Sequence, residues 1–242
     1  MEDSNIVTDE KKNIIDKKKI VALAFQGENF SSKFLICWTN TLSHLWQTGN
    51  YEFLIACGDN QSLMHSRLRT LGLNNEIHKP FNNSKFDYWI SIDNNMLFSP
   101  QQLIDMINSL EEHPVVSGLF KLDDGISYNA IKDLDNQYFS KNGSFKFLQQ
   151  DDLDKWKKEM ETKYIPVDYV GLSFIGARYD VLHKLEYPFF NGENLIIKKE
   201  DDTEYNIVTS EDYNFCKKIK EAGFQIMLNI DIRLGNLVKL VI

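Results

Sequence analysis

The sequence predicts an α/β protein with a mostly parallel central sheet and helices on both faces. Short continuous apolar runs, of which residues 20–25 are the first, are typical of strands buried on both faces of a parallel sheet. Segments with apolar residues at helical spacing follow several of these runs, which gives the strand–helix alternation of α/β proteins. Several runs also end in short polar turns, as expected where a strand leaves the sheet.

The composition favours a globular protein and argues against two classes of partner. The 242 residues are 43% hydrophobic and 12% aromatic, which supplies a sizeable core. Lys and Arg number 27 against 35 Asp and Glu, and this net charge of −8 has the wrong sign for binding nucleic acid or an anionic membrane. No apolar run approaches the roughly 20 residues that a membrane-spanning helix needs.

The chain is expected to divide into a tail and one domain. Residues 1–18 are charged and lack apolar periodicity, which predicts a flexible N-terminal tail without the apolar core of a signal peptide. Residues 19–242 contain the predicted strands and helices and form the expected domain. Cys37, Cys57 and Cys216 show no CxxC spacing, so neither a zinc site nor a disulfide framework is predicted. These features together predict a cytoplasmic protein.

The first two strand–helix units are delimited by glycines and short polar turns. Residues 20–25 form the first predicted strand, and residues 32–48 form a helix that Gly49 caps. Residues 51–57 form the second strand, which is followed by a helix ending near residue 72. The first helix is expected to bury an apolar stripe made of Leu35, Trp38, Leu42, Leu45 and Trp46.

The third unit has the most complete helix-start signal in the chain. Residues 86–92 form its strand. Ser99 is placed as the N-cap of the next helix, Pro100 at the first helical position and Gln102 at the capping-box position. A further strand follows at residues 115–120.

The second half of the chain contains two long polar stretches, and loops of such length usually lie over a binding site. Its predicted elements are a polar segment over residues 121–163 with a short helix at 153–160, an apolar run at 167–175, a short helix at 179–185 and a polar loop at 191–206. The final helix is expected to be capped by Thr209 and ended by Gly223. Residues 224–230 then alternate as the last strand.

The residues that follow the predicted strands are the candidates for a ligand site, because ligands of open α/β sheets bind at the carboxyl ends of the strands. Gln26 and Gly27 follow the first strand, and Asp93 ends the third. A carboxylate next to a buried strand is costly unless a cation or a hydrogen-bond donor meets it. Asp93 is therefore predicted to bind a ligand, and the alternative is that it caps a turn through Asn95 or Ser99.

Several segments, taken in order, resemble the GT-A family of glycosyltransferases. They cover roughly residues 19–238 and are DYWISIDNNMLFSPQQLIDMI, VVSGLF, VDYVGLSFIGARYDVL, EYPFF, SEDYNFCKKIKEAGF and NIDIRLGN. The first contains the region of the family's DxD motif, and the fifth its helix with an adjacent Glu and Asp. Each segment alone is a weak signal, whereas their succession over this length is fairly specific.

The resemblance implies a glycosyltransferase that moves a sugar from a nucleotide-sugar donor to a hydroxyl of a glycan or another acceptor. It implies Asp212 as the base, with Glu211 as a less favoured substitute, and inversion at the anomeric carbon. A carboxylate in the first turn of a helix is also favoured by the helix dipole alone, which is the alternative for this pair. The implied donor-binding residues are Phe25, Gln26, Gly27, Arg67, Asp93 and Asn94. For Arg67 the alternative is an ordinary solvated helix arginine.

The resemblance further implies a divalent cation, Mn²⁺ or Mg²⁺, held by Asp93, Asn95 and Asn236. Two amides here replace the family's second carboxylate and its closing histidine, and hard cations prefer anionic oxygens. The set predicts reduced metal affinity and leaves metal dependence open. It also supports an alternative function, a catalytically silent domain that binds a nucleotide sugar or a glycan.

A sugar-phosphate nucleotidyltransferase is disfavoured. That class needs a Gly-rich loop with basic residues directly after the first strand, to hold the phosphates. The residues at this place are Gln26, Gly27, Glu28 and Asn29, which contain one glycine and no cation.

Overall fold

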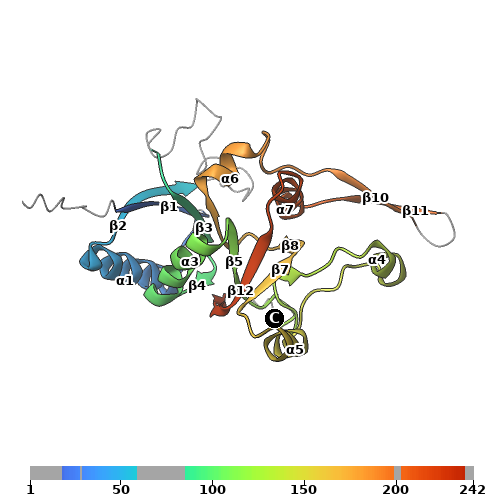
Figure 1. The fold of residues 1–242 in the computed structure, drawn as a ribbon, viewed down its shortest axis with the longest axis horizontal. Coiled ribbons are helices and arrows are strands. Elements are labelled where there is room, and N and C mark those ends of the chain that lie inside the picture. The colour runs from blue at the N-terminus through green and yellow to red at the C-terminus, as the bar shows by residue number, and fades with distance from the viewer. Residues whose placement is uncertain (1–17, 28, 59–84, 199–202, 238–242) are drawn as a thin grey trace, which may run out of the picture.

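The computed structural model describes residues 18–27, 29–58, 85–198 and 203–237. Their centre is a seven-stranded sheet in the order β2-β1-β3-β9-β5-β12-β7 (Figure 1). Five of its strands point the same way, and β9 and β7 run antiparallel to their neighbours. The strands are β1 (Lys19–Gln26), β2 (Tyr51–Gly58), β3 (Tyr88–Asp93), β5 (Val115–Leu119), β7 (Tyr164–Val167), β9 (Phe174–Arg178) and β12 (Ile226–Arg233).

Helices cover both faces of this sheet. On one face lie α1 (Ser32–Thr48) and α3 (Pro100–Glu112), which also contact each other, and the buried residues of this layer form one apolar cluster. On the other face α6 (Tyr179–Lys184) and α7 (Glu211–Glu221) contribute to a second cluster. The side chains of β1 alternate between the two clusters, as the two faces of a strand require. The predicted α/β class, a mostly parallel sheet with helices on both faces, is thus confirmed.

Local sequence signals explain the ends of α1 and α3. Ser99 accepts a hydrogen bond from the backbone of Gln102, whose side chain accepts in turn from the Ser99 backbone N–H at 2.7 Å, so the predicted capping box is present. Pro100 occupies the first helical position. Gly49 ends α1 with a φ of 68°, a left-handed conformation that glycine adopts without steric cost.

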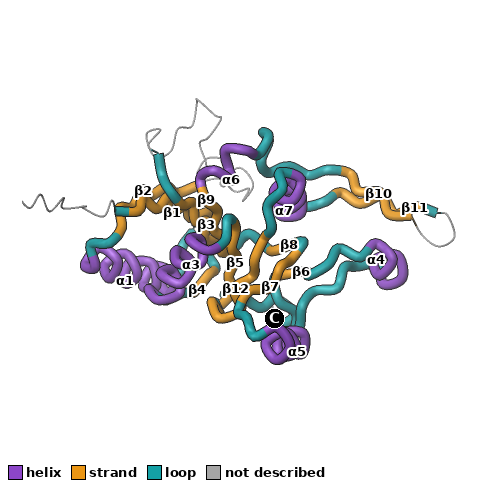
Figure 2. The backbone as a smooth tube through the Cα atoms, viewed as in Figure 1, coloured by secondary structure: helices purple, strands orange, loops and turns teal. Residues whose placement is uncertain are grey.

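Among the described residues, three two-stranded ladders and two further helices lie outside the main sheet (Figure 2). The strands pair as β4 (Met96–Leu97) with β13 (Gly235–Asn236), β6 (Ala130–Ile131) with β8 (Tyr169–Val170), and β10 (Asn194–Lys198) with β11 (Glu204–Val208). The helices are α4 (Asn136–Asn142) and α5 (Gln150–Met160). The β10–β11 ladder extends away from the main sheet, and α4 contacts β10 (Figure 1).

The structure corrects the expected buried stripe of α1. Leu35 and Trp46 were placed in this stripe, but their exposed fractions are 48% and 59%. Leu42 and Leu45 are buried, and Trp38 is half-buried against the cluster. The helix lies at the β1–β2 end of the sheet, where a narrower part of its surface is covered, and helical spacing alone does not give the width of the covered part.

The second half of the chain differs from the prediction at three places. The apolar run at 167–175 is divided among β7, β8 and β9 by turns, and the polar loop predicted at 191–206 contains β10 and β11. The N-cap of α7 is Ser210, whose side chain accepts from the Tyr213 backbone, so the assignment of Thr209 as the cap was wrong. The helix expected to end near residue 72 falls outside the described residues. Among the helices that the structure describes, none combines the length and apolar character needed to cross a bilayer.

Candidate functional site

Asp93 lies at the carboxyl end of β3, in the middle of the sheet. Every residue of β3 is buried, and 3% of Asp93 is exposed. The strand register places Asp93 beside Gln26, the last residue of β1. With its amide oriented to satisfy both of its ends, Gln26 donates to an Asp93 carboxylate oxygen at 3.0 Å and accepts from the Ser91 hydroxyl at 3.1 Å. Gln26 is fully buried, so its side chain supports Asp93 from within the protein.

Gly27 and Asn94 form one tightly packed contact at this edge. Gly27 has a φ of 128°, a backbone conformation that residues other than glycine rarely adopt. A Cβ atom placed there would lie 2.3 Å from Asn94 Nδ2. The Asn94 backbone N–H donates to the Gln26 carbonyl at 3.1 Å, and its side-chain amide donates to the Asn29 carbonyl at 2.7 Å. These bonds leave Asn94 half-buried across the end of β1.

Phe25 belongs to an aromatic cluster beside this edge. Its ring centroid lies 4.6 Å from that of Trp38 and 5.4 Å from that of Phe30. Phe25 itself is half-buried. The aromatic cluster gives the end of β1 an apolar flank next to the polar groups of Asp93 and Asn94.

Asn95 and Asn236, which are 141 residues apart in the sequence, meet in the structure. Asn95 follows β3 in a turn, and Asn236 ends β13, the strand that pairs with β4. Asn95 Nδ2 donates to Asn236 Oδ1 at 3.0 Å, and Asn236 Nδ2 donates to the Lys121 carbonyl at 3.0 Å. The Asn95 Oδ1 atom is buried and has no hydrogen-bond partner among the described residues. The structure thus brings together two of the three residues of the implied metal set.

These residues do not fit a tightly held divalent cation. Asp93 supplies the only carboxylate of the set, and one amide oxygen, Asn236 Oδ1, is already bonded to the Asn95 amide. Within the described part of the chain no group of three His, Cys, Asp or Glu side chains is arranged to hold a metal ion. The unpartnered Asn95 oxygen is a single neutral ligand, whereas Mg²⁺ and Mn²⁺ favour carboxylates and phosphates.

Asp212 lies in the first turn of α7, next to Glu211. Ser210 caps this helix, and both carboxylates therefore sit where the positive end of the helix dipole stabilises negative charge. Asp212 Oδ2 accepts a hydrogen bond from the Leu172 backbone N–H at 3.2 Å. One turn further along, burial raises the pKa of the Cys216 thiol to about 12, which makes this cysteine a packing residue and not a nucleophile.

The turn formed by Leu172 and Ser173 is bonded to the backbone of Asp93 and to the carboxylate of Asp212. The Asp93 backbone N–H donates to the Ser173 carbonyl at 2.9 Å, while the neighbouring Leu172 N–H donates to Asp212. Both contacts place Asp93 and Asp212 against consecutive residues of one turn. This turn was not predicted from the sequence, although Gly171 within the apolar run was a signal for a break there.

The remaining candidate donor residue, Arg67, lies outside the described residues. The other candidate residues lie at two places. One is at the ends of β1 and β3, the other is at the start of α7, and the Leu172–Ser173 turn joins the two. This edge of the sheet is the one at which ligands of α/β proteins bind.

No protein-family model matches this chain, and no curated protein matches it by sequence. Among solved structures, the crystal structure of A197 from STIV is similar with a TM-score of 0.48 and 14% identity, covering 93% of this chain and 96% of A197. The crystal structure of GalNAc-T7 with UDP, GalNAc and Mn²⁺ is similar with a TM-score of 0.49 and 10% identity. That alignment covers 93% of this chain, which spans 45% of the GalNAc-T7 chain. Both similarities concern the course of the backbone.

Proposed function

We propose that this protein is a glycosyltransferase that takes a sugar from a nucleotide-sugar donor. The observation that carries the proposal is the attachment of Asp93 and Asp212 to adjacent residues of one turn. One carboxylate then stands at the strand end, where a donor would bind, and the other at a helix start, where an acceptor hydroxyl could approach. The family resemblance of the sequence assigns the same two roles to the same two residues.

The donor would lie across the ends of β1 and β3. The absent side chain at Gly27 allows Asn94 to close over the strand end, and Asn94 then offers polar groups at the surface. The aromatic flank at Phe25 suits the base or ribose of a nucleotide, because rings of this kind provide a flat apolar contact. Asp93 is held in place from below by Gln26.

In the proposed reaction, the acceptor hydroxyl transfers its proton to Asp212 while its oxygen forms a bond to the anomeric carbon. The bond between that carbon and the diphosphate oxygen breaks with its electron pair, and the nucleoside diphosphate leaves. The Leu172 N–H donates to Oδ2 of Asp212 and thereby orients the carboxylate that takes the proton. Attack from the side opposite to the leaving group inverts the configuration at the anomeric carbon.

A divalent cation, if the reaction uses one, would take most of its ligands from the diphosphate. This follows from the poor fit of Asp93, Asn95 and Asn236 to a resident ion. We therefore expect Mn²⁺ to show no binding to the protein alone and measurable binding once a nucleoside diphosphate is present.

The test of the donor site is the Asp93→Ala variant. Calorimetric titration with UDP and GDP, each with and without Mn²⁺, should show binding to the unchanged protein and none to the variant. The melting temperature should change little, because Gln26 keeps its contacts with Ser91 and the Ile92 carbonyl. Asp154→Ala, on the exposed side of α5, is the control and should bind as the unchanged protein does. Equal binding by Asp93→Ala would disprove the donor assignment.

The second candidate is a catalytically silent domain that binds a nucleotide sugar or a glycan. The amide pair of Asn95 and Asn236 favours this silent domain. The two amides stand where the resembled family has charged or basic metal ligands, and they bond to each other. Release of nucleoside diphosphate from UDP-sugars and GDP-sugars, followed with and without Mn²⁺, separates the candidates. Binding without any release supports the silent domain, and release that depends on Asp212 supports the enzyme.

A further inference from the structure

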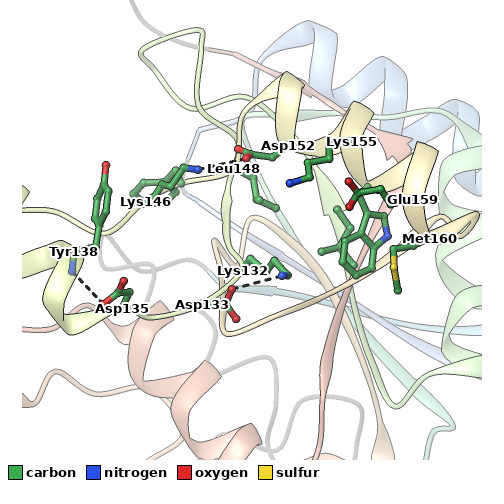
Figure 3. A pocket seen from close by; sticks show the side chains of 13 residues that line it. Lys132, Asp133, Asp135, Tyr138, Lys146, Leu148, Asp152, Lys155, Glu159 and Met160 are labelled. Atoms are coloured by element: carbon green, nitrogen blue, oxygen red, sulfur yellow. Dashed lines mark hydrogen bonds and ion pairs between the residues drawn. The ribbon is translucent and has the colours of Figure 1, made fainter.

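A pocket of about 610 Å³ lies far along the chain from the donor residues (Figure 3). Its walls come from α5, from α4 and the segment that joins it to β6, from residues 146–148 and from β7. It shares no lining residue with the strand ends that hold Asp93 or with the start of α7. Its volume is in the range of sites that bind small molecules.

The indole of Trp156 is part of the pocket wall. Its Nε1–H is buried, and no described residue accepts a hydrogen bond from it. A buried donor without an acceptor destabilises a protein by about 1–3 kcal/mol, and a movement of the indole that brings Nε1 to a ligand oxygen would remove this cost. The Lys132 ammonium lies 5.7 Å from the centroid of the same ring. The pocket wall therefore has a charged group next to a flat apolar surface.

The charges around the pocket are nearly balanced. Lys132 pairs with Asp133 at 3.6 Å and Lys146 with Asp152 at 3.4 Å, as the dashed lines of Figure 3 show. The third lysine, Lys155, and a carboxylate one turn later on α5, Glu159, have no ion pair within the described parts of the chain. With three lysines against four carboxylates in the wall, the pocket offers no net attraction to a phosphate or a sulfate.

We propose that this pocket binds a neutral sugar unit of a glycan. A sugar ring has an apolar face that can lie on the Trp156 indole, and its hydroxyls both donate and accept hydrogen bonds. Such hydroxyls can accept from Lys155 and donate to Glu159 at the same time, whereas an anion would meet Glu159 and a cation would meet Lys155. The pocket is thus a glycan-binding site separate from the donor edge, and its existence does not depend on the proposed transfer reaction.

The test follows the indole N–H signal of Trp156 by two-dimensional ¹H–¹⁵N NMR. The chain has four tryptophans, so the signal is assigned as the one lost in Trp156→Phe. Maltose, cellobiose, lactose and N,N′-diacetylchitobiose are the neutral probes, and sodium phosphate and the zwitterion glycylglycine are the competing probes at equal concentration. We expect at least one disaccharide to shift the Trp156 signal in a saturable way and the other two probes to leave it unchanged.

A second pair of variants covers the case in which Trp156→Phe does not fold. Glu159→Gln and Lys155→Met alter the unpaired polar groups on an exposed part of α5, and each should weaken the disaccharide at least fivefold. Lys158→Met, which is on the same helix but outside the pocket wall, should bind normally. Shifts caused by phosphate or by glycylglycine, or no saturable shift with any disaccharide, would overturn the proposal.

The outcome is independent of the donor site. Binding of UDP and GDP should be unchanged in Glu159→Gln and Lys155→Met, because these residues have no contact with Asp93. Binding of a disaccharide without binding of a nucleotide would support the glycan pocket and overturn the proposed transferase. Binding of a nucleotide without binding of a disaccharide would support the donor site and overturn the glycan pocket.

Discussion

The two halves of the candidate active site are held in place by different kinds of contact. At the donor half, backbone pairing of β1 and β3 fixes Asp93, and the turn residue Ser173 is bonded by the backbone of Asp93 and not by its carboxylate. At the base half, the carboxylate of Asp212 is itself bonded to the turn through Leu172. Asp93 and Gln26 are buried, whereas Asp212 is half-exposed at a helix end.

The two halves should therefore tolerate different substitutions. In the donor half, shape matters most, because strands and buried amides pack without spare room around Asp93 and Gly27. In the base half, the chemistry of one carboxylate matters most, because the start of a short capped helix and the Leu172 N–H orient it. Asp212→Asn, which keeps the shape but removes the charge, should therefore impair the second half without disturbing the fold, and substitutions that add atoms should act mainly on the first half.

The largest expected effect is that of Asp212→Asn. The amide oxygen of Asn can still accept from the Leu172 N–H, so the fold and the donor affinity should be preserved. The amide cannot take a proton, and loss of a general base lowers a rate by roughly 10²–10⁴-fold. Transfer or donor hydrolysis, measured as nucleoside diphosphate released, should fall at least a hundredfold.

Glu211→Gln is the matched control, since Glu211 precedes Asp212 in the same helical turn. It should retain at least a third of the unchanged rate. If Asp212→Asn keeps the full rate while Glu211→Gln loses it, the base is Glu211. If neither change matters, the carboxylates at the start of α7 have no part in proton transfer.

The next effect in size is that of Gly27→Ala. The added methyl group would lie 2.3 Å from Asn94 Nδ2 on a backbone with φ of 128°, so Asn94 must move and the backbone must strain. Residues in such conformations cost about 1–3 kcal/mol, and we expect the free energy of unfolding to fall by this amount. Urea denaturation measures the loss, and calorimetry with UDP or GDP should show weaker binding.

Gly143→Ala is the control that distinguishes the cost of the clash with Asn94 from the cost of a positive φ. Gly143 also has a positive φ, 72°, but a Cβ atom there would meet no atom within 4 Å. Its cost should be about 1 kcal/mol, which is the usual penalty of the left-handed region alone. Equal losses in the two variants, with nucleotide binding intact, would show that Asn94 does not need the space beside Gly27.

The smallest effect concerns Asn95 and Asn236, the amide pair that distinguishes this site from a metal site with charged ligands. In Asn95→Asp with Asn236→His, a carboxylate and an imidazole replace two bonded amides, and both are better metal ligands. Mn²⁺ binding in the presence of UDP or GDP should tighten by roughly tenfold, since affinity rises with the charge of the ligand set. Each single variant should have less than the combined effect. An unchanged Mn²⁺ affinity in the double variant would mean that these residues do not face the diphosphate.

Local signals in the sequence predicted local structure well. Ser99, Pro100 and Gln102 predicted the start of α3 because a capping box is satisfied by neighbours within one helical turn. Gly49 predicted the end of α1 for the same reason. The position of Asp93 at a buried strand end also followed from a continuous apolar run.

Contacts between distant segments could not be predicted in this way. The Asn95–Asn236 bond joins residues 141 apart, and the Leu172 bond to Asp212 depends on how α7 packs against β8. The β10–β11 ladder was missed because each strand is stabilised mainly by its pairing with the other, and of the ten residues in the two strands only Ile197 is buried. The positions of Asp93 at a strand end and of Asp212 in a first helical turn were thus predicted from the sequence, and their attachment to a common turn was not. Their chemical roles stay predictions.

The place of β5 in the sheet has a consequence for how the chain acquires its structure during synthesis. Its neighbours are β9 and β12, and both follow it in the sequence. When residues 115–119 leave the ribosome, both edges of this strand are therefore without partners, and open strand edges are prone to aggregate. The Leu172–Ser173 turn directly precedes β9 and enters the sheet with it. A nascent chain stopped before β9 should hence expose aggregation-prone strand edges and bind no nucleotide. Once β9 and β12 have been synthesised, the edges of β5 should be covered and nucleotide binding should begin.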